Sequence, residues 1–300
     1  MIEMNKRIFH ILLFVMMISL FVSCTKKVDN QEQPKLELKT DVYSNLLDED
    51  SRAYVKKALE KAGIPANDVE TFFGQVDYFN RSINEYGLVK NGFKEKLKIE
   101  ADYDPYKMQD LWDAKNPEFM GYNCRITSYS LLKSQIDIGE FEKESSDILI
   151  FDENSIKNGP DSIFSKNEID GFRTLFHPIN TDATMDLEVH LKNVKDYWKN
   201  KKITFKTKDA SLISVFFHEE QGYLFIGHVG VLVPDVDGNI IFIEKVAFQE
   251  PYQAIRFRDR NDLNDYLMKK YNNSWGQKTI PPFIMENDEL MEGYKVISNQ

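Results

Sequence analysis

Three consecutive apolar runs in the second half of the chain constrain its fold more than any other feature. They are rich in β-branched and aromatic residues and cover residues 212–217, 223–233 and 240–248. The segments between them, 219–222 and 234–239, are turn-rich, and short connections of this kind join neighbouring antiparallel strands. The sequence therefore predicts a meander of antiparallel strands.

Apolar residues at helical spacing predict several helices around this meander. Two are expected early in the chain, over residues 47–62 and from about Val69 to Ile83, where nearly all apolar side chains of the second fall on one face. Further helices are expected over residues 124–135, 186–199 and 261–271. The combination of these helices with an antiparallel sheet predicts the α+β class.

The segments between the predicted helices carry weaker patterns. Residues 147–152 form a short apolar run and are predicted to be a buried strand. Residues 103–122 are polar, aromatic and punctuated by proline, which predicts a structured loop. Residues 153–182 contain scattered Gly, Pro, Asn and Asp, so we expect an irregular excursion there.

The N-terminus has the order of an export signal. Lys6-Arg7 precede a largely apolar run over residues 8–22, which is shorter than the roughly 20 residues of a comfortable membrane span. The junction from Leu20 to Cys24 resembles a bacterial lipobox, whose cysteine is lipidated after cleavage in front of it. We therefore expect a signal peptide over residues 1–23 and an extracytoplasmic protein anchored to the cell membrane through lipid on Cys24. The alternative is an uncleaved N-terminal anchor helix.

The rest of the chain divides into a tether and a folded part. Residues 24–40 have no aromatic side chain and little to bury, which predicts a flexible tether. Residues 41–300 are expected to form a single α+β domain. This domain comprises a helical lead-in over about 41–100 and a core over about 101–300, in which a helix packs against the sheet and a C-terminal helix follows.

Charge and motifs exclude several classes of function. The formal net charge is −10 and no basic stripe is present, which argues against nucleic acid as a partner. No phosphate-binding glycine loop and no dinucleotide fingerprint occur, so no cofactor is expected. His218 and His228 lack the spacing of a helical zinc motif, so no metal site is expected either.

Cys124 is the candidate nucleophile. The chain has 2 cysteines, and lipidation of Cys24 would leave Cys124 as the only free thiol. Asn123 can cap the helix that follows, which places the thiol at a helix N-terminus, where the helix dipole and a nearby imidazolium lower a cysteine pKa. The alternative is an inert buried cysteine.

His228 is the candidate base. It opens a predicted strand between Gly227 and Gly230, where small neighbours allow another backbone or a substrate to approach closely. The alternative is a hydrogen-bonded core histidine. The other histidines of the domain are expected to be structural or exposed: His177, His190 and His218.

Glu244 is the candidate residue that orients the imidazole. A connecting loop with an odd number of residues, such as 235–239, places residues 228 and 244 on the same face of the hairpin, whereas an even loop separates them. Gln253 and Glu250 are the alternatives. For an oxyanion hole or substrate contacts we expect the backbone N–H of Cys124 and the side chains of Tyr122, Asn123 and Gln253.

The order of these residues resembles that of papain-like folds, in which a cysteine opens a helix and a histidine opens a strand of an antiparallel meander. The segments 121–132 and 227–248 resemble the NlpC-type cell-wall cysteine peptidases and related amidases. This resemblance implies a papain-like core and a thiol hydrolase that cleaves amide bonds, with cell-envelope peptides as substrates.

Nearly the whole chain also resembles a family of bacterial lipoproteins known as domain of unknown function 4300, a likeness that implies no established activity. The residues that carry it are Tyr43-Ser44-Asn45-Leu46, Asn123-Cys124-Arg125-Ile126, the His228 strand, Phe242-Ile243-Glu244-Lys245 and Pro251-Tyr252-Gln253.

Two other functions fit the same residues. A non-catalytic lipoprotein would bind a ligand or a protein partner through the Asp- and aromatic-rich segment 103–112. A transglutaminase-like acyltransferase would use the same three groups but would accept amines in place of water.

Overall fold

The computed structural model describes residues 42–95, 99, 101–220, 222–235, 238–272 and 279–297. The predicted signal peptide, the tether and the lipidation site at Cys24 lie outside the described residues. The described residues combine eight α-helices with a mostly antiparallel sheet, so the predicted α+β class is confirmed.

The main sheet contains the predicted meander and extends it on both sides. Every strand pairing described in it is antiparallel. Within the described ranges its order is β11 (Glu289–Leu290), β10 (Phe283–Glu286), β6 (Ser211–Glu219), β7 (Tyr223–Pro234), β8 (Ile240–Lys245), β9 (Tyr252–Phe257), β1 (Val42–Ser44) and β2 (Lys94–Glu95), and β4 (Ile179–Asn180) also pairs with β7. A separate two-stranded sheet joins β3 (Ile136–Asp137) to β5 (Thr204–Phe205).

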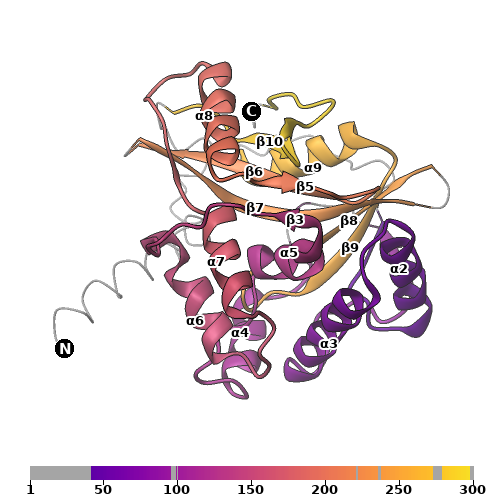
Figure 1. Cartoon of the computed structure of the whole chain (residues 1–300). Coiled ribbons are helices and arrows are strands. Elements are labelled where there is room, and N and C mark those ends of the chain that lie inside the picture. The colour runs from indigo at the N-terminus through magenta and orange to yellow at the C-terminus, as the bar shows by residue number, and fades with distance from the viewer. Residues whose placement is uncertain are drawn as a thin grey trace, which may run out of the picture. The chain divides into compact units, whose positions relative to one another are not determined.

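Helices cover both faces of the main sheet, and α5 and α9 lie on opposite faces (Figure 1). The predicted helices at the start of the chain, after residue 123, after residue 186 and after residue 260 are all present. The full set is α2 (Glu49–Lys61), α3 (Ala66–Ser82), α4 (Pro105–Asp113), α5 (Cys124–Leu132), α6 (Ile150–Asn158), α7 (Lys166–Leu175), α8 (Leu187–Asn200) and α9 (Arg260–Tyr271), with short 3₁₀ helices η1 (Lys133–Gln135) and η2 (Asp147–Leu149).

The prediction of a buried strand over residues 147–152 is wrong, because η2 and the start of α6 occupy this segment. The side chain of Ser146 accepts a hydrogen bond from the backbone N–H of Ile148, which begins a helical turn. A short apolar run does not by itself distinguish a strand from a buried helical segment.

Two segments predicted to be irregular also contain helices. In the segment 103–122, Asp104 caps α4 by accepting from the N–H groups of Tyr106 and Lys107, and Pro105 fills the first turn. In the segment 153–182, Ser165 and Glu168 form a capping box that starts α7. In both cases polar capping residues lie next to short apolar stripes.

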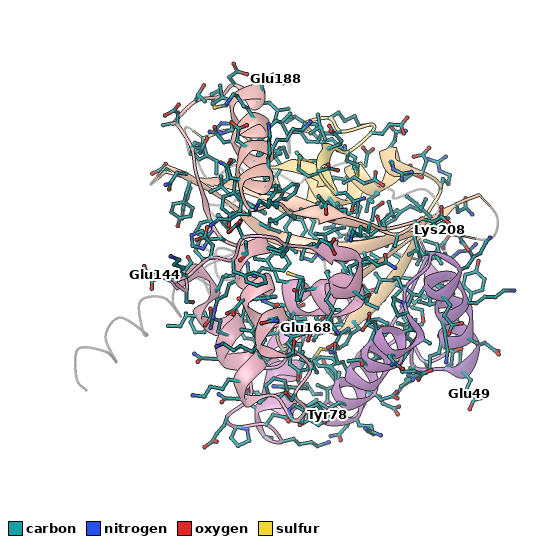
Figure 2. The ribbon with its side chains drawn as sticks, viewed as in Figure 1. Glu49, Tyr78, Glu144, Glu168, Glu188 and Lys208 are labelled. Carbon is teal, nitrogen blue, oxygen red and sulfur yellow. The ribbon has the colours of Figure 1, made fainter. Side chains whose placement is uncertain are left out.

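Alternation along the strands separates two hydrophobic clusters. Val229, Val231 and Ile243 pack with the α5 side of the sheet, whereas Leu232 and Phe242 pack with α9. The charged side chains of Glu49, Glu144, Glu188 and Lys208 lie on the outside of the described fold (Figure 2). Among the described residues, no helix combines the length and the apolar character that a membrane crossing requires.

Candidate active site

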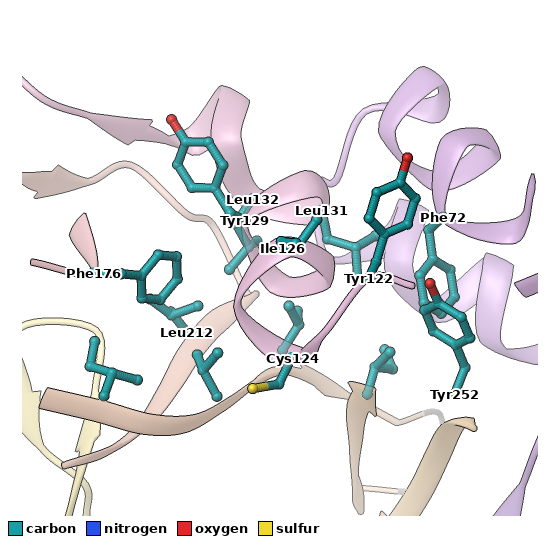
Figure 3. Packing of buried hydrophobic residues seen from close by; sticks show 14 of the residues in the cluster. Phe72, Tyr122, Cys124, Ile126, Tyr129, Leu131, Leu132, Phe176, Leu212 and Tyr252 are labelled. Carbon is teal, nitrogen blue, oxygen red and sulfur yellow. The ribbon is translucent and has the colours of Figure 1, made fainter. Parts of the chain in front are cut away.

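Cys124 is the first residue of α5, and its neighbour Asn123 caps the helix. Oδ1 of Asn123 accepts from the backbone N–H of Ile126 at 3.0 Å, and its Nδ2 donates to Oδ1 of Asp152 at 2.7 Å. Both polar atoms of the Asn123 side chain are therefore engaged within the protein. Figure 3 shows Cys124 at the beginning of α5, with its sulfur directed toward the strands beneath the helix.

A β-bulge at Gly227 directs His228 toward α9. The register of β6 and β7 pairs Val215 with His228 and Phe216 with Ile226, so Gly227 is the extra residue. The ring of Phe217 occupies the space that a Cβ on Gly227 would need. The imidazole of His228 stacks on the ring of Tyr271 in α9, with centroids 4.7 Å apart.

Glu244 lies on the same face as His228. The loop between β7 and β8 joins the paired residues Pro234 and Ile240 and thus has an odd number of residues, the alternative that brings positions 228 and 244 together. Nε2 of His228 lies 2.5 Å from Oε2 of Glu244. The imidazole is therefore held by a carboxylate.

The sheet opens where these side chains meet. Pairing between β7 and β8 ends at Val231 and Ile243, although both strands continue. Here α5, which packs on the opposite face against β7 and β8, brings Cys124 to His228, close enough for each side chain to shift the pKa of the other. Since Glu244 takes Nε2 of His228, the ring nitrogen left for the sulfur is Nδ1.

The three side chains are almost completely buried: Cys124 is 7% exposed, His228 2% and Glu244 0%. Burial raises the pKa of the Cys124 thiol, but the neighbouring His228, the hydrogen bond to it and the Arg125 charge outweigh this effect, so the pKa lies below its ordinary value. Burial lowers the pKa of His228, but Glu244 and Cys124 raise it above its usual value. The two shifts together favour a thiolate–imidazolium pair.

Glu244 is surrounded by donors on the α9 side. Oε1 of Glu244 accepts from Tyr266 Oη at 2.5 Å and from Gln253 Nε2 at 2.5 Å, and Lys270 Nζ lies 3.6 Å away. Burial raises the pKa of Glu244, but Lys270, His228 and Tyr266 hold it far below its usual range. Gln253 is predicted as an alternative orienting group and a substrate contact. In the structure it donates to the carboxylate oxygen of Glu244 that His228 does not contact.

A match over most of the domain identifies the family. A family model described as a domain of unknown function (DUF4300) matches residues 42–291. The chain belongs to the DUF4300 family. Comparisons with curated proteins and with solved structures find no match.

The DUF4300 match includes several site residues that the sequence analysis missed. Arg125 and Asp152 form a buried ion pair beside Cys124, with Nη2 and Oδ2 2.7 Å apart. Tyr266 and Lys270 contact Glu244, and Tyr271 stacks on His228. Arg125 follows the cysteine directly and could have been noticed as a charged residue in the first turn of a buried helix, but its partner is distant in sequence.

Lys245 is a further missed residue, and it lies on the opposite face of β8 from Glu244. It is fully buried, its Nζ donates to the backbone oxygens of Phe248 and Glu250, and it lies 3.5 Å from the ring centroid of Phe79. Burial lowers its pKa well below the ordinary value, although Glu250 and Cys124 act in the other direction. This lysine holds the turn between β8 and β9.

Tyr122 lines a small cavity. The cavity has a volume of about 20 Å³, enough for one water molecule, and Gln75, Lys245 and Tyr252 also line it. Within the described residues, Tyr122 Oη and Gln75 Oε1 have no hydrogen-bond partner. The predicted substrate contact of Tyr122 stays a prediction.

The other histidines lie apart from this site. His190 and His218 pack against each other with ring centroids 4.9 Å apart, and His177 stacks on Tyr197. Among the described residues, no group of three or more His, Cys, Asp or Glu side chains is arranged to hold a metal ion.

Proposed function

We propose that this DUF4300 protein is a papain-like thiol hydrolase that cleaves amide bonds. The observation that carries the proposal is the buried chain of contacts from Cys124 through His228 to Glu244. A thiol at a helix N-terminus, an imidazole beside it and a carboxylate behind the imidazole form the arrangement of nucleophile, base and orienting group that acyl transfer requires.

In the proposed reaction, His228 holds the proton of the Cys124 thiol, and the thiolate attacks the carbonyl carbon of an amide. The proton then passes from His228 to the leaving amine as the C–N bond breaks, which leaves a thioester on Cys124. His228 next takes a proton from water as the water oxygen attacks the thioester carbon. The C–S bond then breaks, which releases the acid and restores the thiolate of Cys124 beside protonated His228. Glu244 stays ionised because three donors surround its second oxygen.

The oxyanion of this reaction would be stabilised at the N-terminus of α5. The first N–H groups of a helix have no partner within it, and Asn123 takes the N–H of Ile126. The backbone N–H of Cys124 is then the donor nearest to the reacting sulfur. This assignment uses the helix terminus and needs no side-chain donor from Asn123.

The expected lipid anchor at Cys24 suggests a substrate class. Lipidation of Cys24 would attach the protein to the extracytoplasmic side of the cell membrane, with cell-envelope peptides within reach. The proposed partners are therefore the membrane, through the lipid anchor, and an envelope peptide as substrate.

Acylation by p-nitrophenyl acetate tests the proposal without knowledge of the natural substrate. We expect a burst of p-nitrophenolate stoichiometric with enzyme at pH 7, an acetyl group on Cys124 by peptide mass spectrometry, and no burst from C124A. A burst of equal size in C124A, or none in the wild type, would contradict the proposal. If turnover is faster with added glycinamide than in buffer without it, the protein is instead a transferase that accepts amines.

A further inference from the structure

Arg125 connects the segment of the nucleophile to the strand of the histidine. Its Nε and Nη2 donate to the two carboxylate oxygens of Asp152 at 2.9 and 2.7 Å, and its Nη1 donates to the backbone oxygen of Ile226 at 3.0 Å. Arg125 follows Cys124 directly, and Ile226 lies two residues before His228. One guanidinium therefore links the residue next to Cys124 with a strand position two residues before His228, and Cys124 and His228 together form the dyad of the proposed mechanism.

The contact with Ile226 lies where the sheet is open. Pairing of this edge of β7 with β4 ends at Leu224 and its pairing with β8 ends at Val231, so among the described residues no strand pairs with this edge beside Ile226 and His228. The Arg125 guanidinium supplies a hydrogen-bond donor to β7 in this stretch. It thereby bridges α5 and β7 at the level of the dyad.

Asp152 anchors the residues on both sides of Cys124. Its Oδ1 accepts from Asn123 Nδ2 at 2.7 Å and from Arg125 Nε, and its side chain is 0% exposed. A buried carboxylate with a bidentate arginine is rigid because each hydrogen bond restricts the other. The nucleophile is thus held from the residue before it and from the residue after it.

We propose that Arg125 and Asp152 are positioning residues that clamp Cys124 against His228 across the opening between β7 and β8. This inference rests on the proposed function of the dyad. The clamp depends on three guanidinium nitrogens that donate to three acceptor atoms, the two carboxylate oxygens of Asp152 and the backbone oxygen of Ile226. Lysine keeps the charge but lacks this planar set of donors, so it cannot replace Arg125.

Cross-linking with 1,3-dichloroacetone measures the geometry of the dyad directly. The reagent alkylates the sulfur with loss of chloride, and its second chloromethyl group then alkylates an imidazole nitrogen only when that nitrogen is within reach. Intact mass separates the cross-linked product, which has lost both chlorines, from the singly attached product, which keeps one.

The matched control is Arg52→Gln. Arg52 also forms a bidentate pair, with Asp77, and also donates to a backbone oxygen, that of Leu46, but it joins α2 to α3. We expect Arg125→Lys to lower the cross-linked fraction at least fivefold, and Arg52→Gln to leave it within twofold of the wild type. Circular dichroism identifies which variants are folded.

Three outcomes would overturn the clamp: wild-type cross-linking in Arg125→Lys, an equal loss in Arg52→Gln, or no cross-linking in the wild type. If Arg125→Lys is unfolded, Asp152→Asn is tested in its place. The cross-linked fraction should again fall at least fivefold, and wild-type cross-linking would again overturn the clamp. A wild-type protein that cross-links but gives no acyl burst contradicts the proposed function and leaves the clamp standing. The two failures are therefore distinguishable.

Discussion

Nε2 of His228 lies 2.5 Å from Oε2 of Glu244, although the strands that carry these residues have stopped pairing at this point. This side-chain contact joins β7 to β8 beyond the point where the backbone pairing of the two strands ends. The same opening lets α5 bring Cys124 to the imidazole from the other face of the sheet. The following predictions test how this arrangement works.

Glu244→Gln is expected to reduce the reactivity of Cys124. The Glu244 charge raises the pKa of His228, and its loss disfavours the imidazolium that stabilises the thiolate. One pKa unit corresponds to about a tenfold change in thiolate population, so we expect alkylation by iodoacetamide at pH 7 to slow about tenfold or more. The control is Glu289→Gln, which removes an exposed partner of Lys195. An unchanged rate in Glu244→Gln would contradict this role.

Tyr266→Phe is expected to destabilise the fold because it removes a hydrogen bond to a buried carboxylate. Hydrogen bonds to charged groups contribute about 1.5–3 kcal/mol, and the free energy of unfolding should fall by about that amount in urea denaturation. Tyr197→Phe, which removes a hydroxyl from the half-buried contacts with Glu142 and Thr174, should cost about 1 kcal/mol or less. Equal losses in the free energy of unfolding would contradict the claim that burial of Glu244 strengthens its hydrogen bond with Tyr266.

Gly121→Ala is expected to disturb the segment that leads to Cys124. Gly121 has a φ of 97°, and a Cβ there would meet the backbone oxygen of Phe248. We expect a loss of about 2 kcal/mol or more in the free energy of unfolding. Gly74→Ala in α3, where a Cβ meets nothing within 4 Å, should instead stabilise by about 0.5–1 kcal/mol. A neutral Gly121→Ala would contradict the close packing of this turn.

His218 is expected to make the fold less stable at mildly acid pH. It is buried, neither ring nitrogen has a partner among the described residues, and burial and His190 lower its pKa. The unfolded chain then binds the proton more tightly, so stability falls as the pH drops below about 6.5. The raised pKa of His228 acts oppositely: its contribution is fully present below about pH 6.5 and is lost as the pH rises through its folded value.

Comparison of His218→Phe with the wild type isolates this effect because His228 is the same in both proteins. Urea unfolding at pH 7.5 and pH 5.5 should show a smaller loss of stability in the variant. The difference should stay below the roughly 1.4 kcal/mol per pH unit that one fully suppressed protonation would give. An equal loss in both proteins would rule out His218 as the source.

Local patterns predicted the centre of the fold well. The meander over β6, β7 and β8 follows from three β-rich runs and two turn-rich segments, and the start of α5 follows from the capping residue Asn123. The wrong strand over residues 147–152 shows the limit of such patterns. Asp152 in that segment is buried because it pairs with Arg125, and an isolated sequence window carries no information about a partner 27 positions away.

The site was predictable only in part for the same reason. Residues 124, 228 and 244 were singled out from helix capping, glycine neighbours and loop parity. The donors around Glu244 lie on β9 and α9, and Tyr266 and Lys270 sit on a helix whose orientation depends on tertiary packing. The opening between β7 and β8 also escaped prediction, because the apolar pattern of each strand continues past the last paired residues.

The pH dependence of Cys124 alkylation tests the central claim most directly, since it measures whether His228 stabilises the thiolate. The rate constant for iodoacetamide should rise with a midpoint below the value of about 8.5 for a free thiol, and His228→Asn should move that midpoint upward with the fold intact. A wild-type midpoint at or above about 8.5 that His228→Asn leaves unchanged would contradict the account.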